Sequence, residues 1–466
     1  MEEKVNTRQL ALEILLDVEQ KKKTLQEALH IMLKRYQYLP KKERAFLTRL
    51  CEGTVEYQIF LDYLIDAFSK IKAKKCKPCI RIILRMAVYQ ICFMSHVPKE
   101  AACNEAVKLA KKKGFQNLSG FVNGVLRNIV RNMDSISLPD EEKQPEKFLS
   151  VKYSTPEWLV SYLLEYYEYP VVKNFLHAAF EEKSTSIRVN ISKTTVEAMV
   201  QKLEEKDILV SPGVYVENAL HIWNYNYMRR VPGFSEGDFA VQDESSMLAG
   251  MALSPKAGSL LVDVCASPGG KSLDAADRML AASMQEGNGQ SHGLVIARDV
   301  SPDKLERFTE NWNRMAFPNV KLEQWDGTAL DASLVGTADY VICDVPCSGM
   351  GVVGRKPDIK YRLQREQLDS LVTLQRAILE NAWQYLKPGG IMVFCTCTVN
   401  PRENEENLKW LINTFPLVPE SLDDYLPQSL WNEDTKRGYL TMMPGIHACD
   451  GFFISRLRRK HYERSS

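Results

Sequence analysis

Two cysteines of this chain, Cys347 and Cys397, lie where thiol chemistry is possible. Each follows an apolar run that is expected to be a β-strand, and the carboxyl ends of such strands border the ligand cleft of an open α/β sheet. A thiolate is a strong nucleophile that can form a covalent intermediate. For other cysteines we prefer the ordinary role of a small buried apolar side chain. These are Cys51, Cys92, Cys103, Cys265 and Cys343. Cys347 and Cys397 are therefore the candidates for catalysis.

Other interpretations of the cysteines can be weighed from their spacing. Zinc needs three or four suitably placed ligands, and neither Cys347 nor Cys397 has them, so we expect no metal. Cys76 and Cys79 are spaced like a redox pair, but they lack the βαβ setting of such pairs, so we expect them to be structural. We also expect Cys395 and Cys397 to point to opposite faces of their strand, so that only one of them faces the cleft.

A glycine-rich turn, Ala266–Lys271, follows the expected strand Leu260–Cys265. Glycines in such a turn let the backbone approach a ligand closely. The turn does not match the dinucleotide fingerprint, and it is not a P-loop, because Cys265 stands where that motif requires its first glycine. On spacing alone, a plain strand-to-helix turn explains these residues equally well.

Acidic residues at successive strand ends favour a cofactor site at this turn. Asp299, Asp326 and Asp344 end the second, third and fourth expected strands. Asp299 stands where a ribose-binding acid belongs, and Asp326 is placed to accept a hydrogen bond from an adenine amino group. Three acids at three strand ends are hard to explain as solvated surface. Together they predict a site for a nucleoside cofactor with a cationic centre.

The scaffold that would bring these residues together is predicted by alternating strand and helix patterns over residues 236–460, which indicate a doubly wound, mostly parallel α/β sheet. The expected strands are Leu260–Cys265, Leu294–Asp299, Val320–Trp325, Ala338–Asp344 and Ile391–Thr396, and the expected helices include Lys304–Met315 and Gln367–Leu386. Gly451–Leu457 is expected to add an edge strand, and residues 281–292 to form a polar insertion on a loop.

Two further domains are expected before the sheet. Apolar residues at helical spacing, such as Ile80, Ile83, Leu84 and Ala87, predict an all-α bundle over residues 1–133. The acidic, proline-containing stretch 134–147 is expected to be a linker. Residues 148–235 mix both patterns and predict a small α+β module. Its expected strands are Ser186–Ile191, Val214–Val216 and Ala219–Trp223, and its expected helices are 157–167 and 195–205.

The charge of the chain is unevenly distributed. Its 466 residues carry a net charge of +1, but residues 1–133 hold 25 Lys and Arg against 13 Asp and Glu, a net of +12, and the remainder has a net of −11. This favours contact of the first segment with a polyanion over a merely solvated basic surface. No disulfide framework, signal peptide or apolar run of about 18 residues is seen. We therefore expect a cytoplasmic protein without a membrane span.

Several segments together resemble one family. Val262–Lys271, Asp344–Gly349 and Thr396–Thr398 resemble the motifs of the NOL1/NOP2/Sun RNA cytosine-5 methyltransferases. The flanking segments Val241–Ser246, Arg355–Asp358 and Asn400–Glu405 resemble its entry segment, the loop after its Pro-Cys motif and the stretch after its nucleophile. Phe121–Arg127 resembles the NusB-like RNA-binding domain, and Tyr153–Leu159 and Arg188–Asn190 resemble the family's middle module. The order of the segments is that of the RsmB (Fmu/Sun) branch, and the resemblance covers nearly the whole chain.

This resemblance implies a multidomain protein. It implies an all-α NusB-like bundle (1–133), a linker (134–147), a small α+β RNA-binding module (148–235) and an α/β Rossmann-like methyltransferase domain (236–460). It also implies transfer of a methyl group from S-adenosyl-L-methionine to carbon 5 of cytosine 967 in 16S ribosomal RNA. The implied partner is that RNA in an unassembled or partly assembled small subunit. We expect the protein to act as a monomer.

The resemblance also implies roles for single residues. Cys397 would attack carbon 6 of the cytosine, Asp344 would hold the edge of the base, and Lys271 would contact the base or the cofactor. Cys347 would assist either removal of the carbon 5 proton or product release. The implied cofactor-binding residues are Cys265, Ala266, Ser267, Pro268, Gly269, Gly270, Lys271, Asp299, Asp326 and Asp344.

Alternatives and departures remain at this point. A non-catalytic RNA-binding or antitermination-type factor would explain the bundle but not the strand-end acids and cleft thiols, and transfer RNA or another ribosomal site is an alternative substrate. The chain has Ser267 where the family has alanine and Thr398 where serine is common, and the 281–292 insertion lengthens the chain before Asp299. His447 and Asp450 are expected to be structural.

Overall fold

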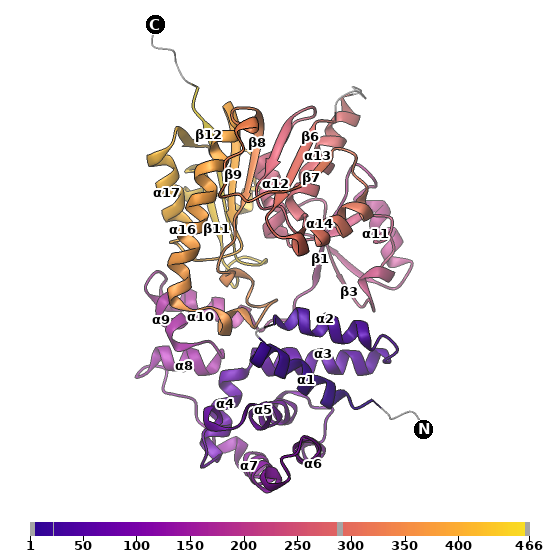
Figure 1. Cartoon of the computed structure of the whole chain (residues 1–466), viewed down its shortest axis with the longest axis vertical. Coiled ribbons are helices and arrows are strands. Elements are labelled where there is room, and N and C mark those ends of the chain that lie inside the picture. Colours follow the sequence, from indigo (N-terminus) through magenta and orange to yellow (C-terminus); the bar gives the residue numbers. More distant parts are fainter. Residues whose placement is uncertain (1–4, 22, 287–291, 462–466) are drawn as a thin grey trace. The chain divides into compact units, whose positions relative to one another are not determined.

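The computed structural model describes residues 5–21, 23–286 and 292–461 (Figure 1). The described part of the chain forms two compact units. One consists of Met1–His177 and Arg355–Leu363 and is called the helical unit here, and the other consists of Ala178–Gly354 and Gln364–Ser466 and is called the sheet unit. The chain therefore passes from the sheet unit into the helical unit and back within residues 355–363.

The helical unit is built around α5, which confirms the predicted all-α bundle. The predicted stripe Ile80, Ile83, Leu84 and Ala87 is at most 1% exposed. Tyr89 and several other side chains on the remaining faces of α5 are buried too, so neighbouring helices cover this helix on several sides. The helices of the unit are α1 (Thr7–Lys21), α2 (Leu25–Arg35), α3 (Lys41–Glu56), α4 (Gln58–Phe68), α5 (Pro78–Phe93), α6 (Lys99–Lys112), α7 (Ser119–Asn132), α8 (Pro145–Lys152), α9 (Glu157–Leu164), α10 (Tyr169–Ala178) and α15 (Ile359–Arg362).

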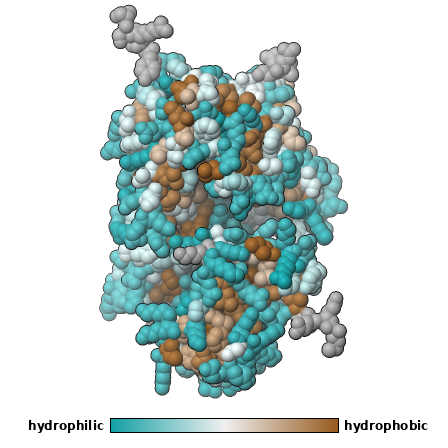
Figure 2. Space-filling model, viewed as in Figure 1, coloured by the Kyte–Doolittle hydropathy of each residue, from teal (hydrophilic) through white to brown (hydrophobic). Residues whose placement is uncertain are grey.

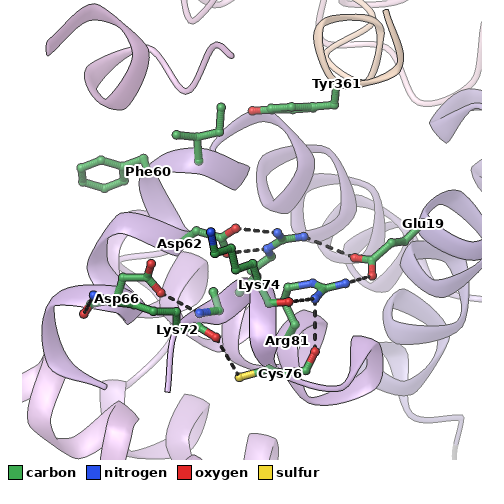
Figure 3. A network of polar contacts seen from close by, with 12 residues as sticks. Glu19, Phe60, Asp62, Asp66, Lys72, Lys74, Cys76, Arg81 and Tyr361 are labelled. Atoms are coloured by element: carbon green, nitrogen blue, oxygen red, sulfur yellow. Dashed lines mark hydrogen bonds and ion pairs between the residues drawn. The ribbon is translucent and has the colours of Figure 1, made fainter. Parts of the chain in front are cut away.

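Charged side chains join α5 to the helices around it (Figure 3). Arg85 of α5 donates to both carboxylate oxygens of Asp62 on α4, at 2.7 and 2.6 Å, and lies 3.4 Å from Glu19 of α1. Arg81, one turn earlier on α5, also pairs with Glu19. Cys76 donates its thiol hydrogen to the Lys72 carbonyl at 3.7 Å. The paired guanidinium groups fix the orientation of α1 and α4 on the central helix.

The segment Arg355–Leu363 is anchored in the helical unit by buried polar groups. The Tyr361 hydroxyl lies 2.6 Å from the carbonyl oxygen and 3.0 Å from the Oγ of Ser154, and Figure 3 shows its ring above α4. Lys360 Nζ donates to the carbonyl of Glu56 at 3.0 Å, and Asp358 accepts from the Leu25 backbone N–H at 3.3 Å. A stretch that follows the Pro-Cys segment in sequence is thus part of the helical unit.

Residues 134–177 lie with the helical unit in this structure. Glu141, inside the predicted linker, accepts hydrogen bonds from Tyr169 at 2.8 Å and Lys173 at 2.5 Å, both on α10. Helices α8 to α10 therefore belong with the bundle, although the predicted module begins at residue 148. The domain boundaries at 133, 147 and 235 remain predictions.

A small antiparallel sheet opens the sheet unit, with the strand order β2-β3-β1-β4. Its elements are β1 (Thr185–Val189), α11 (Val196–Glu204), β2 (Leu209–Pro212), β3 (Ala219–Trp223) and β4 (Phe239–Val241). The predicted strand Val214–Val216 is wrong. The backbone N–H groups of these three residues donate to the buried carboxylate of Glu244 rather than to a neighbouring strand, and β2 precedes them.

The large sheet has the strand order β10-β12-β9-β8-β5-β6-β7, with β11 also paired to β12. Strands β5 to β9 pair in parallel and β12 is antiparallel to its neighbours, so the predicted mostly parallel sheet is confirmed. The strands are β5 (Leu260–Asp263), β6 (Leu294–Asp299), β7 (Val320–Gln324), β8 (Ala338–Asp344), β9 (Leu386–Thr396), β10 (Leu417–Pro419), β11 (Tyr439–Met442) and β12 (Phe452–Arg459). The predicted edge position of Gly451–Leu457 is wrong, because β10 and β11 pair with the outer side of β12.

Helices cover both faces of the large sheet, and each face has its own apolar core. Leu261 of β5 packs with Leu273 and Phe308 on one face, and its neighbour Val262 packs with Ile378 and Leu411 on the other. The helices are α12 (Glu244–Leu253), α13 (Gly270–Gln285), α14 (Pro302–Met315), α16 (Arg365–Ala382), α17 (Glu405–Thr414) and α18 (Glu433–Lys436). This alternation places the strand ends, rather than the strand faces, where a ligand can reach them.

The predicted loop insertion at residues 281–292 is partly helical. Helix α13 continues to Gln285, with Ser283 buried against the unit, and residues 287–291 lie outside the described residues.

Figure 2 shows one face of the molecule, on which hydrophilic side chains predominate and hydrophobic ones form separate patches. Among the described residues, no helix has the length and apolarity needed to cross a membrane.

Candidate active site

The two candidate cysteines come together at the ends of neighbouring strands. Strands β8 and β9 run in parallel with Asp344 opposite Cys395, so the loops that follow them begin side by side. The Sγ atoms of Cys347 and Cys397 lie 3.2 Å apart. The Cys397 carbonyl also accepts the Gly351 backbone N–H at 3.1 Å, which ties the two loops together. Two thiols from separate motifs therefore occupy one site.

The expectation that Cys395 and Cys397 point to opposite faces is wrong. Residues two apart in a strand share a face, and both cysteines pack against the same apolar core. Cys395 is fully buried, and its thiol lies 3.8 Å from Asp344 Oδ1. Cys397 follows the end of β9 and is partly exposed. Exposure, rather than the face of the strand, separates the two cysteines.

Lys271 and Asp344 form the charged part of the site. Lys271 Nζ lies 2.7 Å from Asp344 Oδ2 and 4.9 Å from the centre of the Phe452 ring. Burial alone would lower the pKa of Lys271, but the neighbouring Asp344 carboxylate more than offsets this and the pKa is raised. The Lys271 side chain is 10% exposed and that of Asp344 is 29% exposed. A fixed ammonium group and a carboxylate that a ligand can still reach therefore stand together.

The thiol of Cys347 is held in its protonated form. Its hydrogen bond with Cys397 and its burial both raise its pKa well above the usual value, and the carboxylates of Glu403 and Asp344 add to the shift. Burial likewise raises the pKa of the Cys395 thiol. The raised pKa favours the thiol form of Cys347, and either sulfur of the pair can donate to the other.

The glycine-rich turn Ala266–Lys271 lies between β5 and α13. Gly269 has a φ of +108°, and a Cβ there would lie 3.0 Å from Leu273 Cδ1 and 3.1 Å from Phe308 Cδ2, so glycine is required. Asp299, which is 3% exposed, accepts the Ser267 backbone N–H at 3.2 Å. The carboxylate at the end of β6 therefore supports the turn directly.

Asp263, at the end of β5, was not among the predicted site residues. It is fully buried, accepts the Cys265 backbone N–H at 3.2 Å and accepts the Ser272 hydroxyl at 2.5 Å. Burial raises its pKa to about 7. An acid inside an apolar strand next to a glycine-rich turn is the sequence signal that could have identified it.

The third predicted acid, Asp326, differs from the other two. It is exposed after β7, and its carboxylate accepts the backbone N–H and the hydroxyl of Thr328 at 2.9 and 2.7 Å. The structure places it next to Trp325, whose backbone N–H donates to the Asp299 carbonyl at 3.1 Å. Asp299 and Asp326 are thus neighbours at the ends of β6 and β7, whereas Asp344 belongs to the thiol site.

A group of buried polar residues beside the two thiols was also missed. The carboxylate of Glu403 accepts the Ser348 backbone N–H at 2.9 Å, Gln375 Nε2 at 2.7 Å and Asn400 Nδ2 at 2.8 Å. Asn407 donates to Gln375 Oε1 at 2.8 Å. Asn400 and Glu403 lie in the segment Asn400–Glu405, whose resemblance to the stretch after the family's nucleophile was the available signal, but only the fold shows that these polar residues are buried. They form the support of the site.

His447 and Asp450 have the contacts of structural residues. His447 Nδ1 lies 2.9 Å from the backbone nitrogen of Met443, and burial lowers the pKa of the imidazole. Asp450 pairs with Lys183 at 3.3 Å. Among the described residues, no group of three His, Cys, Asp or Glu side chains could hold a metal ion.

Family models match three parts of the chain. The model described as 16S rRNA methyltransferase RsmB/F matches residues 250–458. The NusB family model matches residues 5–131, and a model of the RsmF/B-like ferredoxin-like domain matches residues 155–226. Each match falls on a part of the chain for which the sequence predicted a domain of that kind.

Full-length relatives and solved structures resemble the chain as well. It is 31% identical over 460 residues to the probable ribosomal RNA small subunit methyltransferase B of Bacillus subtilis, which covers 98% of this chain and 99% of that protein. It is 30% identical to the protein of the same description from Synechocystis sp., with coverage of 98% and 100%. The crystal structure of PH0851 has a TM-score of 0.79 at 24% identity and covers 98% of this chain and 100% of that one, so the two share their fold.

Proposed function

The chain belongs to the 16S rRNA methyltransferase RsmB/F family, and from this premise we propose that it methylates carbon 5 of cytosine 967 of 16S rRNA with Cys397 as covalent nucleophile. The chain is an S-adenosylmethionine-dependent RNA cytosine-5 methyltransferase with a NusB-like domain. The observation that carries the proposal is the pair of thiols 3.2 Å apart beside the ion pair of Lys271 and Asp344.

The proposed reaction begins at Cys397. Carbon 5 of cytosine is a weak nucleophile, and attack of the Cys397 thiolate on carbon 6 converts the ring into an enamine-like species that can accept a methyl group. Partial exposure of Cys397 at the end of β9 supports this role, since the fully buried Cys395 is out of reach of a base. S-adenosylmethionine supplies the methyl group when it is bound.

Asp344 and Lys271 would stabilise charge during the attack. The Asp344 carboxylate is accessible enough to accept a hydrogen bond from the amino edge and protonated ring nitrogen of the cytosine. Lys271 holds that carboxylate in place through the 2.7 Å contact and lies next to the turn. We assign Asp344 to the base and Lys271 to the positioning of Asp344.

Cys347 would act on the adduct after methyl transfer. The carbon 5 proton must leave and the bond between Cys397 and carbon 6 must break before product is released. The Cys347 sulfur lies 3.2 Å from the nucleophile and within reach of the adduct, which supports a part in resolving the adduct rather than in forming it. As a thiol it would donate a proton to the departing Cys397 sulfur, whereas removal of the carbon 5 proton would need its thiolate. Both steps left open for Cys347 belong to this stage of the reaction.

The residues around the turn fit the cofactor. A positive-φ glycine allows close approach of the backbone, and the buried Asp299 carboxylate stands beside the turn, where a ribose hydroxyl would be bound. Asp326, exposed at the next strand end, is available to the adenine amino group. We propose that these residues hold S-adenosylmethionine, together with Cys265, Ala266, Ser267, Pro268, Gly270 and Lys271.

The target cytosine would have to leave any base-paired helix to reach Cys397. We propose that the basic helical unit and the small module hold the surrounding RNA through its phosphates. A net charge of +12 over residues 1–133 supports this role. The proposed substrate is the RNA of an unassembled or partly assembled small subunit, and the proposed location is the cytoplasm.

Bisulfite sequencing of ribosomal RNA tests the function and its position together. In a strain without this protein, we expect one 5-methylcytosine of 16S rRNA, at position 967, to be lost and to return when the chain is expressed again. Loss of methylation at a different cytosine would overturn the position. An unchanged methylation pattern would overturn the function.

A further inference from the structure

The fully buried carboxylate of Glu403 lies between the loops that carry the two thiols. Its oxygens accept the Ser348 backbone N–H at 2.9 Å, Gln375 Nε2 at 2.7 Å and Asn400 Nδ2 at 2.8 Å. Ser348 follows Cys347 directly, and Asn400 stands three residues after Cys397. One carboxylate thus bonds to both loops at once.

All of these donors are uncharged N–H groups. In the part of the chain that the structure describes, Glu403 has no ion-pair partner and its side chain is 0% exposed. A buried carboxylate is costly unless it is hydrogen-bonded on every side, so its position is tolerated only while these donors stay in place. The Glu403 carboxylate therefore couples the position of the Cys347 loop to that of the Cys397 loop.

A second layer of buried residues holds Glu403 and its donors. Gln375 of α16 also donates to the Pro346 carbonyl at 2.8 Å, and Asn407 of α17 donates to Gln375 at 2.8 Å. Asn404 accepts the Thr396 hydroxyl at 2.6 Å and donates to the Thr398 carbonyl at 3.0 Å. Both thiol loops are therefore fixed to α16 and α17 by side chains without solvent exposure.

The hydroxyls next to the thiols complete the link. Ser348 Oγ and Thr398 Oγ1 lie 2.7 Å apart, and each stands one residue after a cysteine of the pair. Serine, which is common in the family where this chain has Thr398, would keep this hydroxyl. The contact keeps the two loops in register directly, while Glu403 does so through their backbones and side chains.

We propose that Glu403 is a positioning residue that holds the thiols of Cys347 and Cys397 at contact distance. The effect of this role on methyl transfer rests on the proposed function, whereas the positioning of the two thiols does not. Glu403 touches neither thiol. Its charge also contributes to the raised pKa of Cys347, after the larger effects of the hydrogen bond with Cys397 and of burial. Glu403 thereby favours the protonated state of Cys347 without contacting either thiol.

Disulfide formation between the two thiols measures their approach without any substrate. Diamide oxidises two neighbouring thiols to a disulfide, and the two electrons and two protons that they lose reduce diamide to its hydrazine. Differential alkylation and peptide mass spectrometry give the rate for the pair of Cys347 and Cys397. In Glu403→Gln we expect this rate to fall about tenfold or more, since displacements near 1 Å strongly affect reactions of positioned groups.

The control is Glu405→Gln. Glu405 is a neighbouring carboxylate that accepts the Thr441 hydroxyl at 2.6 Å and bonds to neither thiol loop. We expect its disulfide rate to equal that of the unsubstituted protein. Gln375→Met serves as a second test variant, because it removes the three hydrogen bonds of Gln375 with Pro346, Glu403 and Asn407 and leaves the Glu403 carboxylate in place. Circular dichroism and thermal melting check that each variant folds.

The disulfide rate decides the proposal. A lower rate in folded Glu403→Gln and Gln375→Met supports it, and an unchanged rate in both folded variants would overturn it. Steady-state methylation adds a second readout, in which we expect kcat to fall and KM for RNA to stay constant. If the unsubstituted protein does not methylate ribosomal RNA, the proposed function fails, whereas the thiol measurement still tests the position of Glu403.

Discussion

Lys271 Nζ and Asp344 Oδ2 lie 2.7 Å apart, although 73 residues separate them in sequence. Lys271 is the last residue of the glycine-rich turn and lies in the first turn of α13, and Asp344 is the last residue of β8. The pair therefore joins the proposed cofactor turn to the thiol site across two adjacent strands, β5 and β8. Because the sheet fixes the positions of Lys271 and Asp344, the two charges need little rearrangement when a base binds.

Replacement of Asp344 by asparagine tests this pair. Without the carboxylate, burial dominates the pKa of Lys271 and lowers it, and the base loses its charged acceptor. We expect the single-turnover rate of methyl transfer to fall about 100-fold or more, as for other removed transition-state contacts. The control is Asp339→Asn at the opposite end of β8, where Asp339 pairs with Lys387 at 3.0 Å. Equal rates in the two variants would contradict the role of Asp344.

The nucleophile assignment predicts a separation of binding from chemistry in Cys397→Ala. Removal of the thiol should abolish methyl transfer, while affinity for RNA and for S-adenosylmethionine stays within about threefold, since the loop is held by backbone contacts of Gly351. Calorimetry measures cofactor binding, and transfer of labelled methyl groups measures the reaction. Cys79→Ala, in the helical unit, is the control for loss of a thiol. A near-normal rate in Cys397→Ala would refute covalent catalysis by this residue.

The role of Cys347 predicts a trapped intermediate. In Cys347→Ala the attack of Cys397 should still occur, but resolution of the adduct should be slow, so a covalent protein–RNA species accumulates. A denaturing gel with labelled RNA detects it as a band of reduced mobility. The doubly substituted protein, Cys347→Ala with Cys397→Ala, should give no such band. Absence of the band in the single variant would count against a part for Cys347 in adduct resolution.

The strand ends were accessible to sequence reasoning because they follow from local patterns. Apolar runs and the parallel order of an α/β sheet were enough to place Cys347, Cys397, Lys271 and Asp344 at one edge, and the structure brings these four side chains together. Asp299 was likewise placed beside the turn, where it bonds to Ser267. Each of these residues lies at the end of an element whose period and length can be recognised in the sequence.

Contacts between distant segments could not be obtained in this way. The position of β12 inside the sheet depends on β10 and β11, whose three and four residues are too short to show a period. Anchoring of Tyr361 in the helical unit depends on carbonyl groups of Glu56 and Ser154, and backbone acceptors leave no trace in sequence. The Glu403 support depends on burial of amide side chains that are usually exposed, which only tertiary packing decides.

Asp263 makes the stability of the sheet unit depend on pH. Burial raises its pKa from 3.8 to about 7, so the folded protein holds this proton more tightly than the unfolded chain does. The stabilisation is therefore complete below pH 3.8 and is lost as the pH rises through 7. Asp263→Asn removes this proton and its pH dependence, while the amide can still accept the Cys265 N–H.

We expect the melting temperature of Asp263→Asn, relative to that of the unsubstituted protein, to rise from about pH 5 to pH 7 and to level off above pH 7. Thermal melts in the absence of cofactor, at closely spaced pH values, measure this difference. Asp326→Asn is the matched control, because hydrogen bonds from Thr328 lower the pKa of that exposed carboxylate and it stays ionised over the whole range. A constant difference between Asp263→Asn and the unsubstituted protein would show that Asp263 is already ionised in the folded state at the acid end of the range.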